Sequence, residues 1–268
     1  MQIIFNRFPF GFNKAISMSY DDGKIYDRKL VEIFDKFNIK ATFHLNAGTL
    51  DNEDTVKTTE IADLYKNHEI SCHTFSHPFL LNSPREQLVY EIYRDRQVLE
   101  SCSKYPVRGM SYPYGNFNEK IIKEFTSLGI EYSRTVIASN NFNIPSDFMQ
   151  WNPTCHHRNN ISEKLEEFSM IGDDAKKMSL FYVWGHSYEF NDNDNWDLIE
   201  EFCEKASNLK NIWFASNIEI YDYIQALSML KFNVDRTMVY NPSSITCFFD
   251  ADGELVTAKS GETTYFAK

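Results

Sequence analysis

The chain has 268 residues, of which 43% are hydrophobic and 24% charged, and this ordinary globular composition excludes a disordered or fibrous protein. Its 27 basic and 38 acidic residues give a formal net charge of −11, which makes nucleic acid and anionic membranes poor partners. No stretch approaches the roughly 18 apolar residues of a membrane span, and the first residues lack the pattern of a targeting signal. The five cysteines are widely spaced, so we expect a cytoplasmic protein with reduced thiols.

Strand and helix signals alternate through the first half of the chain. Leu30, Ile33 and Phe34 share one helical face, Ser83 and Pro84 have the character of a helix start, and Gly129 follows the end of a helical pattern. The patterns predict strands at 14–20, 39–45, 69–72, 108–112 and 130–137, with helices at 28–37, 59–66, 84–102 and 119–128.

The second half continues the alternation after an irregular segment, 138–160, whose length is typical of a functional loop. Strands followed by crossover helices indicate parallel strands in an α/β barrel or a doubly wound sheet. From 231 onward, short apolar runs separated by turns predict a small antiparallel β appendage that caps the barrel or mediates dimerisation. We therefore expect a barrel domain at 1–230 and a C-terminal β extension at 231–268 packed on it. The later elements are helices at 161–171, 196–206 and 218–230, and strands at 180–184, 212–215, 238–240 and 247–249.

Two adjacent carboxylates, Asp21 and Asp22, stand at the end of the first predicted strand. Ligands of parallel α/β folds bind at this end of the sheet. Burying two like charges is costly unless a cation or a proton intervenes, and neighbouring side chains point in different directions. One carboxylate can therefore bind a metal while the other contacts a water, although an isolated Asp-Asp-Gly is more often a turn.

The third predicted strand is followed by His73 and His77. Histidines four residues apart can lie on one face of a helical turn and bind one metal ion. Thr74 stands where a metalloprotease H-E-x-x-H motif has its glutamate, which disfavours a protease. Together with Asp22, the two imidazoles predict a divalent metal site with open positions, suited to zinc hydrolysis or to an oxygenase-type iron.

Two further clusters follow later strands. The turn at 111–116 places the Tyr114 backbone N–H where it could stabilise an oxyanion, although an ordinary turn is the simpler interpretation. His186 is a candidate general acid, because histidine titrates near neutrality. A single histidine after a strand is usually structural, and only the co-occurrence of four clusters at strand ends favours an active site.

In their order these motifs resemble the polysaccharide deacetylase family, also called the NodB-homology family or carbohydrate esterase family four. The matching segments are S-Y-D-D-G at 19–23, H-T-F-S-H at 73–77, Y-P-Y-G at 112–115 and W-G-H at 184–186. The resemblance spans about residues 14–225 and implies a distorted (β/α) barrel of the NodB-homology type. It also implies a metal-dependent hydrolase that removes acetyl groups from N-acetylated or O-acetylated sugars or glycoconjugates.

The resemblance also assigns roles to individual residues. Asp21 would be the general base that takes a proton from the attacking water, and His186 would protonate the leaving amine. The Tyr114 N–H would contact the oxyanion of the tetrahedral intermediate. One divalent metal ion, zinc, would be held by Asp22, His73 and His77.

The chain departs from the family pattern at two places. Arg108 lies five residues before Pro113, further than the family's arginine usually does, and Gln150 stands where the fourth motif has its second aspartate. The family pattern thus does not identify which residue pairs with the Asp21 carboxylate. It also does not identify which residue tunes the proton affinity of His186. Candidates for substrate binding or tuning are Arg108, Asp147, Trp151, His156, His157 and Trp184.

Three functions remain in competition. The first is deacetylation of an amide-linked acetyl group on a sugar, with a small oligosaccharide, glycolipid or soluble conjugate as substrate. The second is hydrolysis of a non-sugar amide or ureide, and the third is a metal-binding or sugar-binding module without turnover. A binding module has no need for Asp21 beside a complete set of metal ligands, which favours an enzyme.

Overall fold

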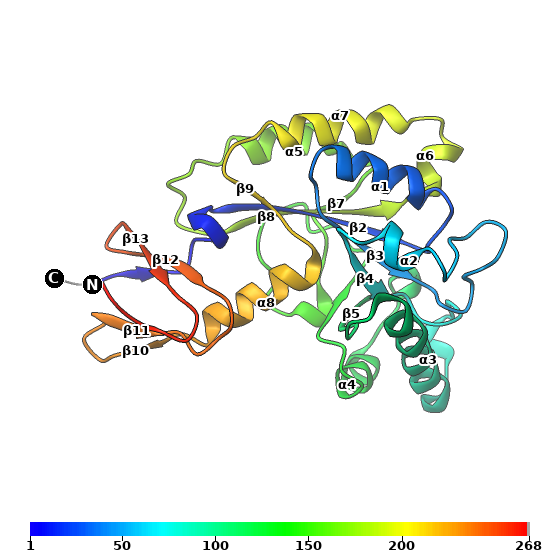
Figure 1. Cartoon of the computed structure of the whole chain (residues 1–268), viewed down its shortest axis with the longest axis horizontal. Helices are drawn as coiled ribbons and strands as arrows, with labels where there is room; N and C mark the ends of the chain where they lie inside the picture. The colour runs from blue at the N-terminus through cyan, green and yellow to red at the C-terminus, as the bar shows by residue number, and fades with distance from the viewer. Residues whose placement is uncertain (267–268) are drawn as a thin grey trace.

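The computed structural model describes residues 1–266, and its centre is a sheet of eight parallel strands that curls into an incomplete barrel (Figure 1). The strand order is β6-β5-β4-β3-β2-β8-β7, and β9 pairs with the first part of β2. The predicted distorted α/β barrel is confirmed. The strands are β2 (Lys14–Asp21), β3 (Ala41–Leu45), β4 (Glu69–Cys72), β5 (Gly109–Ser111), β6 (Tyr132–Arg134), β7 (Cys155–His156), β8 (Ser179–His186) and β9 (Ile212–Phe214).

All eight residues of β2 are buried, because other elements cover both faces of this strand. Ile16, Met18 and Tyr20 pack in the main apolar core, beneath the helices. The residues between them are small and polar: Ser17 and Ser19 make buried hydrogen bonds with Asn217 and His44. The interior of the barrel is therefore polar along β2, and Asp21 continues that polar row at the carboxyl end of the strand.

Helices cover the outside of the sheet, with α1, α5 and α7 along one side and α3 and α4 along the other (Figure 1). The predicted helix at 59–66 is reduced to four residues, since its buried side chains are only Ile61 and Tyr65. No helix within residues 1–266 has the length and apolarity needed to cross a lipid bilayer. The helices are α1 (Asp27–Lys36), α2 (Ile61–Leu64), α3 (Arg85–Ser103), α4 (Glu119–Ser127), α5 (Ile161–Ser169), α6 (Tyr188–Asp192), α7 (Trp196–Ser207) and α8 (Asn217–Ser228).

The segment 138–160, expected to be an irregular loop, contributes the edge strand β7 and a single helical turn at Phe148–Gln150. Tertiary pairing creates both features: the Thr154 N–H donates to Tyr182 of β8, and the Trp151 N–H donates to Ser133 of β6. This segment therefore lies between the two ends of the curled sheet.

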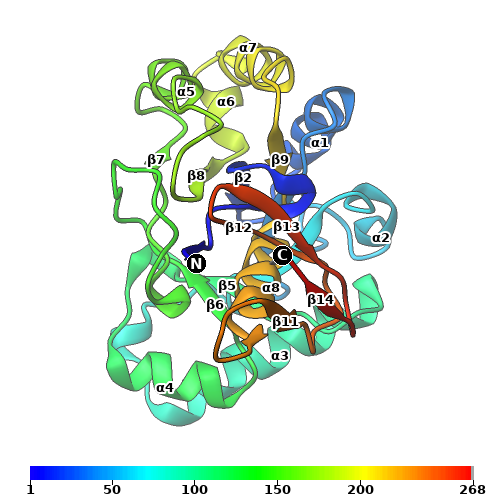
Figure 2. The same cartoon turned by 90° about the vertical axis from the view of Figure 1, so that its left-hand side faces the viewer.

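Two small antiparallel sheets follow the barrel, and Figure 2 shows them in front of α8. Their apolar side chains, among them Val239 and Phe249, share a second core with Tyr223 of α8 and Phe8. A strand from the start of the chain joins one of the sheets, and the division into domains at residue 230 stays a prediction. Of the expected extension, residues 267–268 lie outside the described part. The orders are β1 (Ile3–Ile4), β12 (Cys247–Ala251), β13 (Glu254–Ala258), and β10 (Lys231–Phe232), β11 (Met238–Tyr240), β14 (Thr263–Tyr265).

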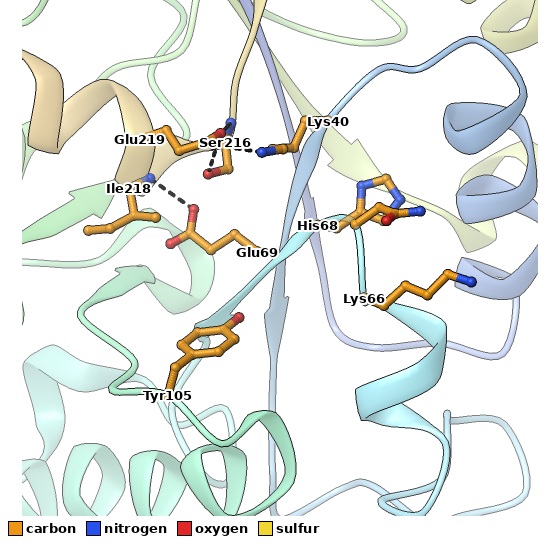
Figure 3. A pocket seen from close by; sticks show the side chains of 9 residues that line it. Lys40, Lys66, His68, Glu69, Tyr105, Ser216, Ile218 and Glu219 are labelled. Atoms are coloured by element: carbon orange, nitrogen blue, oxygen red, sulfur yellow. Dashed lines mark hydrogen bonds and ion pairs between the residues drawn. The ribbon is translucent and has the colours of Figure 1, made fainter. Parts of the chain in front are cut away.

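A cavity of about 440 Å³ opens at the amino ends of β3 and β4, beside the start of α8 (Figure 3). Glu69 lies at its floor and is buried. One oxygen of Glu69 accepts hydrogen bonds from the Thr42 hydroxyl and the Ile218 N–H, each at 2.9 Å, and the other accepts from the Tyr132 hydroxyl at 2.7 Å. These bonds join three strands of the barrel, β3, β4 and β6, to α8, so the cavity floor supports the fold at the end of the sheet opposite to His73.

We expect Glu69→Gln to flatten the dependence of stability on pH. Burial raises the pKa of Glu69 from 4.5 to about 7, against the effect of its three hydrogen bonds. The stabilisation from the protonated form is complete below the unfolded pKa and disappears as the pH rises through about 7, a loss of up to about 3 kcal/mol. Glutamine keeps the hydrogen bonds, since the Tyr132 hydroxyl can donate instead to Ser71 Oγ, 3.1 Å away.

The measurement is the free energy of unfolding by urea at pH 5, 6, 7 and 8. Asp27, whose pKa burial also raises to about 7, keeps its own contribution in both proteins. The exposed Glu32→Gln serves as the control and should follow the parent. A Glu69→Gln variant that loses stability as steeply as the parent would contradict the role of this carboxyl group.

Candidate active site

Polar side chains from six strand ends gather at one end of the barrel. Because the strands are parallel, their carboxyl ends share one edge of the sheet, where α/β proteins bind ligands. The residues at or directly after these ends are Asp21 and Asp22 of β2, His73 of β4, Ser111 of β5, Arg134 of β6, His156 of β7 and His186 of β8.

Asp22, His73 and His77 face one another across this end of the barrel. Asp22 Oδ1 lies 3.7 Å from His73 Nε2 and 3.9 Å from His77 Nε2, and the three ligand atoms all lie within 4.8 Å of one another. Ligand atoms around a tetrahedral zinc ion are roughly 3.3–3.6 Å apart, so only a small closure is needed. One carboxylate and two imidazoles fit a first-row divalent ion and leave positions for water or substrate.

The orientation of His73 supports this assignment. His73 Nδ1 lies 2.9 Å from the backbone oxygen of Ser111 and 2.6 Å from its hydroxyl. A carbonyl oxygen can only accept, so Nδ1 carries the proton and Nε2 presents a lone pair toward Asp22 and His77. This tautomer is the one that a metal ligand requires.

Two buried carboxylates of α3 hold the histidine segment in place. Asp95 accepts from the backbone N–H groups of Ala47 at 2.7 Å and His73 at 3.1 Å. Glu91 accepts from the N–H and the hydroxyl of Ser76, both at 2.7 Å. The ligand-bearing turn is therefore fixed to a long helix before any ion is bound.

Backbone strain concentrates at the same place. Asp22, Thr74, His77 and Tyr114 adopt positive φ angles of 80°, 66°, 56° and 57°. Non-glycine residues in this region cost about 1–3 kcal/mol each and persist where the surroundings hold them, which occurs preferentially at functional sites. The bonds from α3 supply such support for the segment that contains Thr74 and His77.

Asp21 forms a buried ion pair with Arg134 Nη2, and both side chains are almost inaccessible. Ser111 Oγ donates to the other carboxylate oxygen at 3.0 Å. The Arg134 guanidinium lies 4.4 Å from the ring centre of Trp184, a cation–π contact. Burial alone would raise the pKa of Asp21, but the positive charge of Arg134 outweighs it and holds that pKa well below its usual range. Asp21 is therefore ionised at neutral pH.

His186 lies near the second carboxylate oxygen of Asp22, with Nε2 4.0 Å from Asp22 Oδ2. Its Nδ1 lies 3.5 Å from Glu189 Oε1. Burial lowers the pKa of His186, but the contact with Glu189 and the charges of Asp21 and Asp22 outweigh it, so the net shift is upward. The imidazole thus carries a proton at higher pH than an ordinary histidine, as a general acid needs.

Tyr114 lies in a single helical turn, Pro113–Gly115, directly after β5. Its exposed ring contacts the His77 ring, with centres 4.5 Å apart, and lies 5.9 Å from Phe79. The side chain therefore borders the metal-ligand group. The assignment of its N–H as an oxyanion donor stays a prediction.

Arg108, a candidate for substrate binding or tuning, lies away from the metal-ligand group, so the structure does not support that role. It directly precedes β5, at the opposite end of the sheet, and binds Glu131 and Asp222, each at 2.6 Å. The arginine that reaches Asp21 is Arg134, which the sequence analysis missed. Its signal was available, because a charged residue inside the predicted strand 130–137 needs a buried partner.

The other candidates divide into two sets. Asp147 is exposed and accepts from the Met149 N–H at 2.8 Å, and Trp151 is buried against Tyr132 and Tyr182, so neither lines the metal-ligand group. Three candidates do lie beside His186, with His156 Nε2 and His157 Nε2 at 3.0 and 3.1 Å from Glu189 Oε2. The residues of this second set are His156, His157 and Trp184.

Comparison with known proteins gives this geometry a context. Residues 12–133 match the model of a family described as polysaccharide deacetylase. The chain is 28% identical over 117 residues to the peptidoglycan-N-acetylglucosamine deacetylase of Bacillus cereus, a match that covers 42% of this chain and 41% of the relative. The chain spans less than half of the length of the curated relatives that it matches. The family match includes Asp21, Asp22, His73 and His77, and it ends before Arg134 and His186.

Solved structures share the fold over more of the chain. A protein from Mycobacterium smegmatis described as a polysaccharide deacetylase superimposes with a TM-score of 0.62, at 15% identity, over 82% of this chain and 93% of the other. A family 4 acetyl xylan esterase from Clostridium thermocellum, solved with a cobalt ion, gives a TM-score of 0.53 at 14% identity, over 78% and 90% of the two chains. At these identities the likeness concerns the fold.

Proposed function

Because residues 12–133 match the polysaccharide deacetylase family, we propose that the chain is a metal-dependent hydrolase that removes an acetyl group from an acetylated sugar or glycoconjugate. One observation carries the proposal: the buried, ionised Asp21 is adjacent to Asp22, which faces His73 and His77. A group that can accept a proton thus stands beside a complete set of ligands for one divalent ion.

The metal-ligand group supports zinc as the ion, since zinc favours imidazole and carboxylate ligands in a site with open positions. A divalent ion bound there would lower the pKa of a water molecule and polarise the acetyl carbonyl. Asp22, His73 and His77 hold the ion in this proposal. Asp21 remains free of it, because Arg134 and Ser111 occupy its two oxygens.

The chain's own residues supply the proton transfers. Asp21 accepts a proton from the attacking water, and Arg134 keeps this carboxylate ionised and in position. His186 donates a proton to the leaving nitrogen or oxygen of the sugar. The backbone N–H of Tyr114 stabilises the developing oxyanion.

The substrate that we propose carries an amide-linked acetyl group on a sugar. The named relatives act on peptidoglycan N-acetylglucosamine and on acetyl xylan, which together cover amide and ester acetyl groups. The exposed Tyr114 ring and the half-buried Trp184 ring beside the site are surfaces on which a sugar ring can pack.

We expect His77→Ala to lose the metal while the protein stays folded. His77 is half-buried at the rim of the barrel, outside both apolar cores, so its loss removes one of three ligands and little packing. The parent should hold one zinc ion per chain after dialysis against zinc, and the variant should hold less than a tenth of that by elemental analysis. His156→Ala, at a neighbouring strand end, is the matched control and should retain the ion.

The same proteins test hydrolysis, measured as acetate released from an N-acetylglucosamine tetramer. Acetate release is expected from the zinc-loaded parent and is expected to be lost in His77→Ala. Bound zinc without release from any acetylated sugar would favour a binding module, and release only from a non-sugar amide would favour the second function considered above. A parent without stoichiometric metal would contradict the mechanism.

A further inference from the structure

Glu189 lies at the centre of a polar group that the family motifs do not assign. It belongs to α6, three residues after His186, and its side chain is only 7% exposed. Arg158 Nη2 lies 2.6 Å from Glu189 Oε1, and His156 Nε2 and His157 Nε2 lie 3.0 and 3.1 Å from Glu189 Oε2. One buried carboxylate is thus surrounded by four nitrogen-bearing side chains.

The family's fourth motif supplies no carboxylate to His186 in this chain. Gln150 stands at the relevant position, and its side chain is exposed and donates to Asp147 at 2.7 Å. Asp147 is itself exposed and directed to the Met149 N–H. The acid histidine therefore takes its carboxylate partner from another element.

Glu189 contacts His186 twice. Its Oε1 lies 3.5 Å from His186 Nδ1, and its Oε2 accepts from the His186 backbone N–H at 3.3 Å. His186 Nε2 faces the opposite way, toward Asp22. A carboxylate on one ring nitrogen fixes the tautomer and the ring plane, and so aims the other nitrogen.

Glu189 is itself held in place. His157 is buried with its ring stacked between Tyr20 and Phe190, with ring centres 5.8 and 4.2 Å away. There is room for this ring because Gly185 has no Cβ, which would lie 2.0 Å from His157 Nδ1. The stacked rings hold His157 in place, and His157 in turn contacts the Glu189 carboxylate that lies beside His186.

From this geometry we infer that Glu189 is the positioning residue of the acid histidine, replacing the missing aspartate of the fourth motif. The inference rests on the proposed function. His156, His186 and Glu189 could also hold a second metal ion, since their ligand atoms lie within 4.8 Å of one another. The Arg158 guanidinium donates a hydrogen bond to the same carboxylate at 2.6 Å, and its positive charge disfavours a cation there.

The test uses two substrates that differ in their need for an acid. Amide hydrolysis in an N-acetylglucosamine tetramer needs a proton on the leaving nitrogen, whereas 4-nitrophenyl acetate releases a stable anion without one. In Glu189→Gln we expect kcat on the tetramer to fall roughly 10- to 100-fold, with KM little changed. The rate on 4-nitrophenyl acetate should change less than about threefold. The ratio of the two rates does not depend on the fraction of folded protein.

Two further variants complete the experiment. Glu189→Asp keeps the carboxylate charge, but its side chain is one methylene shorter, so the charge lies further from His186. Its ratio of the rate on the tetramer to the rate on 4-nitrophenyl acetate should therefore lie between those of the parent and of Glu189→Gln. Should Glu189→Gln not fold, a Glu189→Asp ratio equal to that of the parent would overturn the inference. Glu167→Gln, an exposed change on α5, is the control and should keep the parent's ratio.

The outcomes separate the inference from the proposed function. A parent that hydrolyses both substrates, with an unchanged ratio in Glu189→Gln, would overturn the positioning role alone. Two metal ions per parent chain and one per Glu189→Gln chain would assign the group as a second metal site and overturn it as well. A parent that hydrolyses neither substrate would overturn the proposed function and this inference with it.

Discussion

Asp21→Asn should bind zinc as the parent does and lose deacetylation. Asparagine has the shape of aspartate but cannot accept the proton of the attacking water, so kcat should fall roughly 10²- to 10⁴-fold. The metal should remain, because Asp22, His73 and His77 are unchanged and Asp21 lies 3.9 Å from the nearest of the histidine nitrogens. Acetate release and zinc content, measured on the same preparation, test both parts.

The substitution also leaves the buried Arg134 without its counter-ion, so the assay temperature must lie below the unfolding transition of the variant. Asp147→Asn changes an exposed aspartate and should keep the parent's kcat. If zinc-loaded, folded Asp21→Asn deacetylates at the parent's rate, Asp21 is not the base. Loss of zinc from this variant would instead make Asp21 a metal ligand.

Arg134→Met should be the most destabilising single change at the site. Methionine fits the volume of the arginine stem but leaves Asp21 charged, buried and unpaired. Removing one partner of a buried ion pair lowers the free energy of unfolding by roughly 3–5 kcal/mol. Arg108→Met is the matched control: Arg108 also binds carboxylates, but its side chain is 32% exposed, so the loss should be within about 1 kcal/mol.

A double-variant cycle isolates the pair. Asp21→Asn/Arg134→Met removes both charges, so it should recover much of the stability that Arg134→Met loses. The measurement is urea unfolding of the parent, the two single variants and the double variant. Additive losses would mean that the two side chains do not depend on each other, against the geometry of the structure.

The sequence was most informative where local pattern and strand direction coincide. Strand signals that end at Asp21 and at Cys72 predicted that Asp22 and His73 would share one edge of a parallel sheet, and the structure places them 3.7 Å apart. Parallel strands make this inference possible, because their carboxyl ends lie together whatever their order. The sequence pattern could not predict the order of the strands in the sheet or how strongly the sheet curls.

Arg134 illustrates that limit. Its strand is the fourth neighbour from β2 in the sheet, and in a flat sheet the two would be far apart. Only the curling of the sheet brings the arginine across the barrel to Asp21. Glu189 was missed for a different reason: α6 is a short helix, and nothing in its pattern shows that a glutamate there turns inward to His186.

The pairing of β1 with β12 has a consequence for the order of folding. The Gln2 N–H donates to Asp252, 250 residues away, and Ile3 pairs with Ala251. A contact between such distant positions must close a very long loop, so it forms slowly and late. During synthesis, the strands from β2 to β6 can assemble while Ile3 and Ile4 are still without partners. β1 is thus synthesised before the barrel strands but is fixed in place after them.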